Sequence, residues 1–219
     1  MAHNPNIEKI IRTLRREVKN LKTPSVTMVG RKWKSPFLVL ISCLLSLRTK
    51  DEVTLPASER LFALAASPQG MFRLSIPTIE KTIYPVGFYK TKARNIKLIC
   101  QTLIKKFASQ VPADIDTLLT LRGVGRKTAN LVMTEGFGKL GICVDTHVHR
   151  ISNRFGYIAT KTPEETEWAL RAKLPKKFWI EYNALLVMWG QNICKPVSPF
   201  CSRCAVKDLC QRKEVELSR

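Results

Sequence analysis

The sequence predicts an all-α protein, and three observations support this fold class. Apolar residues recur mainly at spacings of three and four, which is the period of an amphipathic helix. Alternating apolar and polar runs, which would indicate half-buried strands, are scarce. Turn signals rich in glycine and proline, such as Ser67-Pro68-Gln69-Gly70 and Gly123-Val124-Gly125, separate the helical stretches. We therefore expect a chain of helices joined by short turns.

The helices can be placed in order along the chain. The first has one apolar stripe, largely clear of its basic residues, and ends before Pro24; the stripe is Ile7, Ile10, Ile11, Leu14, Val18 and Leu21. The second, from about Pro36 to Leu47, is apolar on nearly every side, which indicates a buried helix, and proline suits its first turn. Further helices are expected at roughly 57–66, 76–83, 90–108, 114–121, 126–137, 146–155, 163–173 and 178–190.

The composition indicates a protein that binds a polyanion. Lysine and arginine number 37 against 17 acidic residues, which gives a formal charge of +20 over 219 residues. A charge this large repels itself in the folded state and is typical of proteins that bind DNA, RNA or an anionic membrane surface. The longest apolar run, 37–47, is too short to span a bilayer, and the N-terminus lacks the apolar segment of a signal peptide. We expect a soluble, intracellular protein.

Four cysteines close to the C-terminus predict a metal centre. Their spacing is C-x6-C-x2-C-x5-C, and the intervening residues are too polar to fold unaided; the four are Cys194, Cys201, Cys204 and Cys210. A structural zinc site usually has two C-x2-C pairs, and only one is present. Three unequal gaps suit a [4Fe–4S] cluster better, with zinc and disulfides as the alternatives. The other three cysteines, Cys43, Cys100 and Cys143, lie in apolar contexts and are expected in the core.

The segment from Ile115 to Met133 is expected to form a helix, a tight turn and a second helix. Gly123 and Gly125 allow the backbone angles of a very short turn. Amides at the start of the second helix would then point outward and could bind phosphate without reading base sequence. A plain helical turn is the alternative. A nucleotide-binding P-loop is excluded, because Arg126 separates Gly125 from Lys127 and the preceding element is helical.

Two residues are candidates for chemistry. Lys127 lies in the first turn of the second helix, where its neutral amine could attack an electrophilic carbon; a phosphate contact or a solvated lysine is the alternative. Asp145 precedes an amphipathic helix and is a candidate N-cap, a role compatible with stabilising positive charge on a sugar. His147 and His149 do not predict a metal site, because too few other ligands lie near them.

These motifs together resemble the endonuclease III family of DNA glycosylases, within the helix-hairpin-helix glycosylase superfamily. The resemblance covers about residue 30 to Cys210 and includes three motifs: residues 121–130, residues 144–150 and the four cysteines. It implies a helical barrel domain at 29–139, with the hairpin at about 114–137. It also implies a discontinuous iron–sulfur cluster domain made of 1–28 and 140–219. The cleft between them would bring Lys127 and Asp145 together.

The resemblance also implies a mechanism. A damaged pyrimidine nucleotide is flipped out of the duplex, and Lys127 attacks C1′ as the base departs. Asp145 stabilises the cationic sugar, a Schiff base forms, and β-elimination cleaves the strand. The expected partner is double-stranded DNA with damaged bases or abasic sites. The protein is expected to be a monomer in the cytoplasm of a prokaryote. Contacts to DNA are expected at Arg48, Phe88, Arg122, Gly123, Gly125, Thr128 and His147.

This chain departs from the family pattern at two positions. Arg122 stands where the family usually has proline. Arg48 stands where the family has a glutamine that fills the hole left by the flipped base, and Phe88 aligns with a second wedge, usually leucine; a core aromatic is its alternative. The basic stretch that follows is expected to contact the DNA backbone, and comprises Lys90, Lys92, Arg94 and Lys97.

Two other functions are left open. Arg48 makes a uracil or thymine mismatch glycosylase an alternative, although thymine-mismatch relatives carry tyrosine where Lys127 stands. Adenine-mismatch glycosylases carry a small residue there and a glutamate near Ser42, and this chain has neither. A non-catalytic iron–sulfur DNA-binding protein is the second alternative, and the presence of both Lys127 and Asp145 argues against it.

Overall fold

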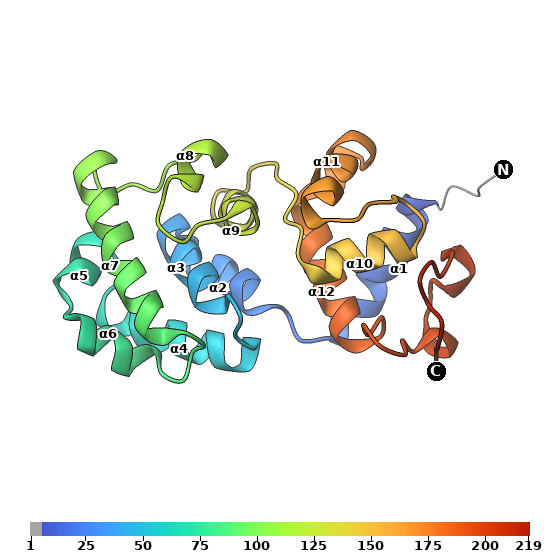
Figure 1. Cartoon of the computed structure of the whole chain (residues 1–219), viewed down its shortest axis with the longest axis horizontal. Coiled ribbons are helices and arrows are strands. Elements are labelled where there is room, and N and C mark those ends of the chain that lie inside the picture. The colour runs from blue at the N-terminus through green and yellow to red at the C-terminus, as the bar shows by residue number, and fades with distance from the viewer. Residues whose placement is uncertain (1–5) are drawn as a thin grey trace. The chain divides into compact units, whose positions relative to one another are not determined.

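The structure, a computed structural model, describes residues 6–219, and helices joined by turns and loops are its regular secondary structure, with no strand among the described residues (Figure 1). The all-α prediction is confirmed. The chain divides into two compact units. We call Ser25–Gly141 the hairpin unit, and residues up to Pro24 together with Ile142–Arg219 the cysteine unit. The boundaries expected from sequence fall at 29 and 139.

The hairpin unit is built around one buried helix. Nine of its residues in succession, 37–45, are buried, and it packs against α2, α4, α7, α9 and the π-helical turn at Val132–Gly136 (Figure 1). This helix is α3 (Pro36–Ser46); Ser35 accepts a hydrogen bond from the Leu38 amide as its N-cap, and proline occupies its first position. The other helices of the unit are α2 (Ser25–Trp33), α4 (Asp51–Leu64), α5 (Pro68–Arg73), α6 (Ile76–Ile83), α7 (Tyr89–Lys106), α8 (Ile115–Leu119) and α9 (Arg126–Leu131).

Two helices of this unit were not predicted, and a third is longer than expected. α2 contains β-branched residues and Gly30, which weaken a helical pattern, but a Cβ at Gly30 would lie 2.7 Å from the Glu135 carbonyl oxygen. α5 begins within an expected turn: Ser67 accepts from the Gly70 amide at 3.1 Å, so this serine and the proline after it start a helix. α4 begins at Asp51 and carries Pro56 inside it.

The cysteine unit joins the N-terminal helix to the C-terminal part of the chain. α1 (Ile7–Glu17) and α10 (Thr146–Arg154) both pack against α12 (Trp179–Asn192), and α11 (Pro163–Lys173) packs against α10. The core combines the apolar stripe of α1 with residues of α10 and α12, such as Ile151, Phe155 and Tyr182. After α12 the chain has only two short 3-10 turns, Cys201–Arg203 and Lys207–Leu209.

The last residues of the chain are hydrogen-bonded to the cysteine segment. The Arg219 amide donates to the Pro199 carbonyl at 2.8 Å, and the Ser202 amide donates to the Arg219 carbonyl at 2.9 Å. The Arg219 guanidinium also lies 4.1 Å from the centroid of the Phe200 ring. The end of the chain therefore folds back along the cysteine segment.

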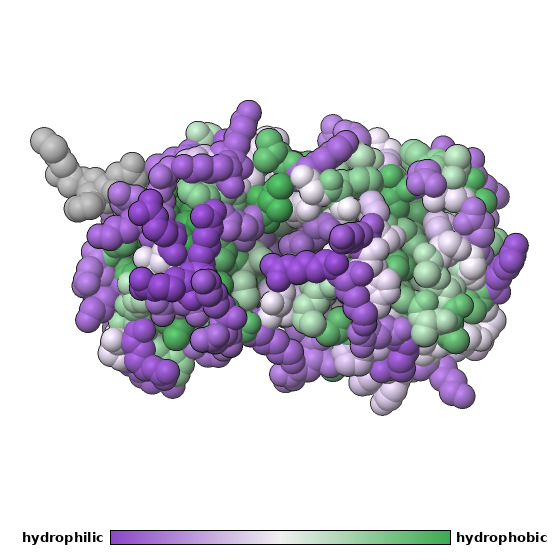
Figure 2. All heavy atoms as spheres, turned by 180° about the vertical axis from the view of Figure 1, so that it is seen from behind, coloured by the Kyte–Doolittle hydropathy of each residue, from purple (hydrophilic) through white to green (hydrophobic). Residues whose placement is uncertain are grey.

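The surface carries many hydrophilic side chains, with smaller apolar areas between them on the face drawn in Figure 2. This pattern fits a chain in which one residue in four is charged. Within residues 6–219, no helix is both long enough and apolar enough to cross a membrane.

Candidate functional site

The turn between α8 and α9 has the expected hairpin geometry. Gly123 has φ +77°, and a Cβ there would lie 2.8 Å from Nδ2 of Asn95, so the position requires glycine. The Val124 amide closes the turn on the Leu121 carbonyl at 3.1 Å. Gly125 is the N-cap of α9 and has no side chain with which to accept from the first amides of that helix. The turn therefore presents backbone amides beside an open position, because nothing lies within 4 Å of a Cβ built at Gly125.

Lys127 is half-buried in the first turn of α9. Its charge acts on Cys43, a buried thiol in the middle of α3. Burial raises the pKa of Cys43 to about 12, while Lys127 opposes that rise and Glu135 adds to it. The lysine thus lies close to the central helix of the unit. Thr128 beside it is 2% exposed, so any DNA contact there would come from its backbone.

Arg48 and Phe88 come together although forty residues separate them. Both are exposed, and the Arg48 guanidinium lies 5.6 Å from the centroid of the Phe88 ring. Phe88 is 62% exposed, so the alternative of a core aromatic is excluded. Both residues have left-handed backbones, with φ +51° at Arg48 and φ +58° at Phe88. Such angles are unusual outside glycine and mark strained positions.

The four basic residues of the stretch after Phe88 differ in exposure and in the groups that they contact. Lys90 and Arg94 are exposed, as a phosphate contact would need. Lys92 is 7% exposed, and its ammonium donates to backbone carbonyls within the unit. The ammonium of Lys97 likewise donates to the carbonyls of Phe72 and Leu74. The ammonium groups of Lys92 and Lys97 are thus held by carbonyls of the unit, so the expectation of a phosphate contact is wrong for both, and nothing in the spacing of these residues could have revealed it.

Asp145 is the N-cap of α10. Its Oδ1 accepts from the amides of His147 and Val148, each at 2.9 Å, as the sequence predicted. The carboxylate is half-buried. His147 packs tightly against α12: a Cβ at Gly190 would lie 2.3 Å from its Nδ1, and Arg150 also contacts this nitrogen at 3.2 Å.

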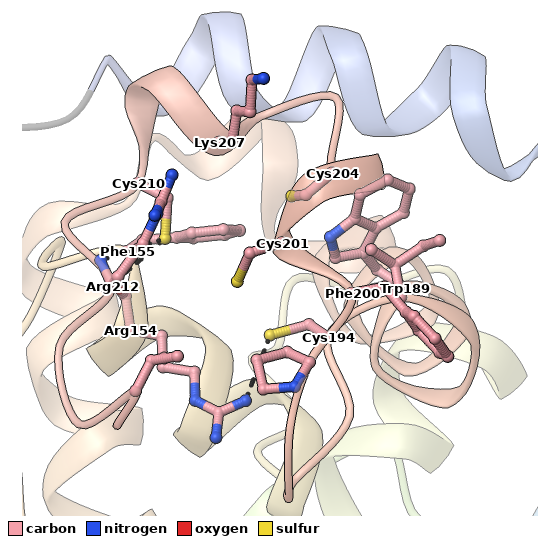
Figure 3. Close-up of a pocket in the computed structure, with 13 residues that line it drawn as sticks. Arg154, Phe155, Trp189, Cys194, Phe200, Cys201, Cys204, Lys207, Cys210 and Arg212 are labelled. Carbon is pink, nitrogen blue, oxygen red and sulfur yellow. Dashed lines mark hydrogen bonds between the residues drawn. The ribbon is translucent and has the colours of Figure 1, made fainter. Parts of the chain in front are cut away.

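The four cysteines line one pocket of the cysteine unit. Figure 3 shows their side chains around a common space, with the rings of Phe155, Phe200 and Trp189 beside them. No group of three or more potential ligands among residues 6–219 is placed to hold a single metal ion. The donor set, four thiols from one short segment, is the set that a four-iron cluster requires.

A buried arginine supports the pocket. Arg154, at the end of α10, donates to the carbonyls of Lys195 at 2.6 Å and Pro196 at 2.7 Å, and lies 3.5 Å from Sγ of Cys194 (Figure 3). Arg150 donates to the Cys194 carbonyl at 2.9 Å. These contacts fix the first turn of the cysteine segment and place positive charge near its sulfurs. No local sequence pattern marks either arginine for this role.

Burial disfavours the thiolate form of two cysteines in this pocket, Cys204 and Cys210. Burial raises the pKa of Cys204 to about 11, and burial also raises the pKa of Cys210. A thiolate loses its hydration in such a site, so the charged form needs compensating positive charge. Iron or zinc would supply that charge, because metal binding deprotonates its thiol ligands.

Comparison with known proteins identifies the class. A family model described as "HhH-GPD superfamily base excision DNA repair protein" matches residues 41–176. Endonuclease III of Thermotoga maritima is 46% identical over 182 residues, which cover 83% of this chain and 85% of that protein. Two solved structures, one described as a non-covalent endonuclease III–DNA complex and one as a trapped covalent intermediate, each match with a TM-score of 0.84. Both are 32% identical and cover 97% of both chains.

The helical fold, the glycine turn and the lysine after it therefore belong to a base excision DNA repair protein of the HhH-GPD superfamily. Within that superfamily, the chain belongs to the endonuclease III family. Both statements confirm the resemblance that the three sequence motifs carry.

Proposed function

We propose that this protein is a bifunctional DNA glycosylase and abasic-site lyase that removes oxidised pyrimidines from duplex DNA. The observation that carries the proposal is the placement of Lys127 in the first turn after the glycine hairpin, in a chain of the endonuclease III family. The trapped covalent complex of a protein with the same fold supports a reaction through a covalent intermediate. The charge of +20 supports duplex DNA as the partner.

Lys127 is the proposed nucleophile. Its neutral amine attacks C1′ of the deoxyribose, and the electron pair of the glycosidic bond leaves with the base. Opening of the sugar ring then gives a Schiff base between C1′ and Nζ. Loss of a proton from C2′ expels the 3′ phosphate, and this β-elimination cuts the strand. Water finally hydrolyses the Schiff base and releases the enzyme.

Asp145 is proposed to stabilise the positive charge that develops on the sugar. Its Oδ1 is fixed by two amides of α10, so the carboxylate is oriented before substrate binds. The amides of the turn at Gly123 and Gly125 are proposed to bind phosphate, with Arg122 beside them. Arg48 and Phe88 are proposed to enter the duplex where the damaged nucleotide leaves it.

The cofactor is proposed to be a [4Fe–4S] cluster held by Cys194, Cys201, Cys204 and Cys210. The arrangement of the four side chains around one pocket supports it, as does the basic support from Arg154. The cluster would fold the cysteine segment, and the chemistry at C1′ needs no electron from it. Purified protein should absorb visible light and contain about four iron atoms per chain. One zinc per chain without visible absorbance would exclude the cluster.

Borohydride trapping tests the reaction. Duplex oligonucleotides with thymine glycol, an abasic site or no damage are incubated with the protein and reductant, and covalent adducts are resolved by denaturing electrophoresis. We expect adducts with the two damaged duplexes and none with Lys127→Gln. Lys106→Gln, which removes the same charge from an exposed position, is the matched control and should trap normally.

The same assay separates the alternatives. Adducts formed preferentially with uracil or thymine mismatches would favour a mismatch glycosylase, which Arg48 leaves open. No adduct with any damaged duplex, together with DNA binding that survives Lys127→Gln, would instead indicate a non-catalytic DNA-binding protein.

A further inference from the structure

Lys92 is buried in a protein whose lysines are otherwise at least partly exposed in the described range. It lies in the first turn of α7, where its ammonium faces inward. Burial lowers the pKa of Lys92 to about 8. A buried lysine costs free energy unless its ammonium is well paired, so this position requires an explanation.

The Lys92 ammonium has three acceptors, and all belong to the end of α3 and the residues just after it. Nζ donates to the Leu45 carbonyl at 2.8 Å, to the Leu47 carbonyl at 2.5 Å and to the Thr49 hydroxyl at 3.2 Å. The last carbonyls of a helix have no partner within it and carry its negative dipole end. Lys92 therefore caps the C-terminus of α3 from another helix.

The same contacts connect the two strained turns. Oγ1 of Thr49 also accepts from the Gly87 amide at 3.1 Å, and a Cβ at Gly87 would lie 2.7 Å from the Arg48 carbonyl oxygen. The acceptors of Lys92 thus lie on both sides of Arg48, and the Thr49 hydroxyl ties that segment to the residue before Phe88. Without Lys92, the Leu45 and Leu47 carbonyls and the Thr49 hydroxyl would lose the donor that they share. The left-handed turns that carry the wedge residues would then be held less firmly.

We propose that Lys92 is a positioning residue that holds Arg48 and Phe88 as one pre-formed pair for insertion into the opened duplex. The proposal deepens, and rests on, the proposed glycosylase function. A wedge that is ordered before binding does not lose conformational freedom when it enters DNA. Since both side chains are exposed and lie 5.6 Å apart, their joint position depends on the backbone turns that Lys92 bridges.

The chain offers a matched control on the same helix. Lys97 lies five residues later in α7, and its ammonium donates to the carbonyls of Phe72 and Leu74 at the end of α5. It therefore performs the same kind of capping away from Arg48 and Phe88. Lys92→Met and Lys97→Met remove the charge and the donors while keeping a long side chain.

The experiment compares two substrates that differ in their need for a wedge. Single-turnover excision of thymine glycol from a duplex requires the nucleotide to be extruded. Borohydride trapping on a single-stranded abasic oligonucleotide requires Lys127 but no duplex opening. We expect Lys92→Met to slow duplex excision about 10- to 100-fold, as expected for misplaced reacting groups, and to leave single-strand trapping within about twofold of the parent. Lys97→Met should leave the ratio of the two rates unchanged.

The outcomes are separable. An unchanged ratio of the two rates would overturn the proposal: equal losses on both substrates would mean that Lys92 only supports folding, and no loss on either would mean that it has no role in the reaction. If Lys92→Met does not fold, Thr49→Val removes the link to Gly87 from the other side and must lower the same ratio. A parent protein that traps neither substrate would refute the proposed function itself, whatever the variants do.

Discussion

The hairpin unit and the cysteine segment hold their functional residues in different ways. In the hairpin unit, the turns that carry Lys127, Arg48 and Phe88 are anchored on α3, a helix buried along nearly its whole length. The cysteine segment 194–210 has two short 3-10 turns and few apolar side chains, and it is held by Arg154, Arg150 and the C-terminal residues.

The two regions thus differ in what holds their functional residues, which is packing in the hairpin unit and, as proposed above, a bound cluster in the cysteine segment. Burial of apolar surface stabilises the hairpin unit whether or not anything is bound. The cysteine segment instead directs four thiols, two of them with raised pKa values, at one space. Its order should therefore depend on the group that it binds, whereas the hairpin unit should respond mainly to changes in side-chain volume and backbone angle.

The largest expected effect is from Cys204→Ser, which removes one proposed cluster ligand. We expect loss of visible absorbance and rapid trypsin cleavage after Arg203 or Lys207, because the segment has no core of its own. Limited proteolysis with mass spectrometry would locate the cuts. Cys100→Ser, at a buried thiol of α7, is the control and should keep the absorbance. Retained absorbance in Cys204→Ser would contradict the difference between the regions.

Gly30→Ala should destabilise the hairpin unit far more than the same change at Gly125. The added Cβ would lie 2.7 Å from the Glu135 carbonyl oxygen, which is backbone and cannot move freely. Overpacking of this kind costs about 1–3 kcal/mol. Urea unfolding would measure the cost, and Gly125→Ala is the control because its Cβ would meet nothing within 4 Å. Equal midpoints for the two variants would mean that α2 can shift without loss.

Gly123 and Phe88 both have left-handed backbone angles, but substitutions at these two positions should have different effects on stability. Gly123→Ala should lower stability by about 1–2 kcal/mol, since φ is +77° and Nδ2 of Asn95 occupies the space of the Cβ. Phe88→Gly should relieve backbone strain, so the melting temperature should stay unchanged or rise slightly. The same variant should excise the damaged base from duplex DNA more slowly. Thermal unfolding and single-turnover excision, measured on both variants, test the pair. A stability loss in Phe88→Gly would mean that its ring supports the fold.

The smallest expected effect concerns Glu135, whose partly buried carboxyl lies in the π-helical turn. Burial raises the pKa of Glu135, although the Thr27 hydroxyl donates to it at 2.9 Å and Arg31 lies near. The folded state therefore holds the proton more tightly than the unfolded chain, so stability is lost as pH rises through the folded pKa. Glu135→Gln should melt about 2–4 °C higher at pH 7. The gain should vanish near pH 4, and a constant difference across pH would exclude ionisation as its cause.

The sequence determined the fold class and the three motifs that define the family. Helical period, turn residues and cysteine spacing are local patterns, and they depend on physics that acts within a few residues. The N-cap role of Asp145 and the turn at Gly123 were predicted for the same reason. Helices that local pattern describes poorly, such as α2 with Gly30, were missed because their stability comes from close packing against distant residues.

Which basic side chains are exposed, and so able to contact DNA, depends on the tertiary structure. Lys92 and Arg94 are two residues apart in one basic stretch, yet Arg94 is exposed and Lys92 is buried. Two of the three acceptors of Lys92 are backbone oxygens, at Leu45 and Leu47, and such oxygens occur at every residue, so no sequence pattern can mark them. The support of the cysteine segment by Arg154 is likewise made through carbonyls. Backbone groups become specific partners only when the fold leaves them unpaired at the end of a helix or in a loop.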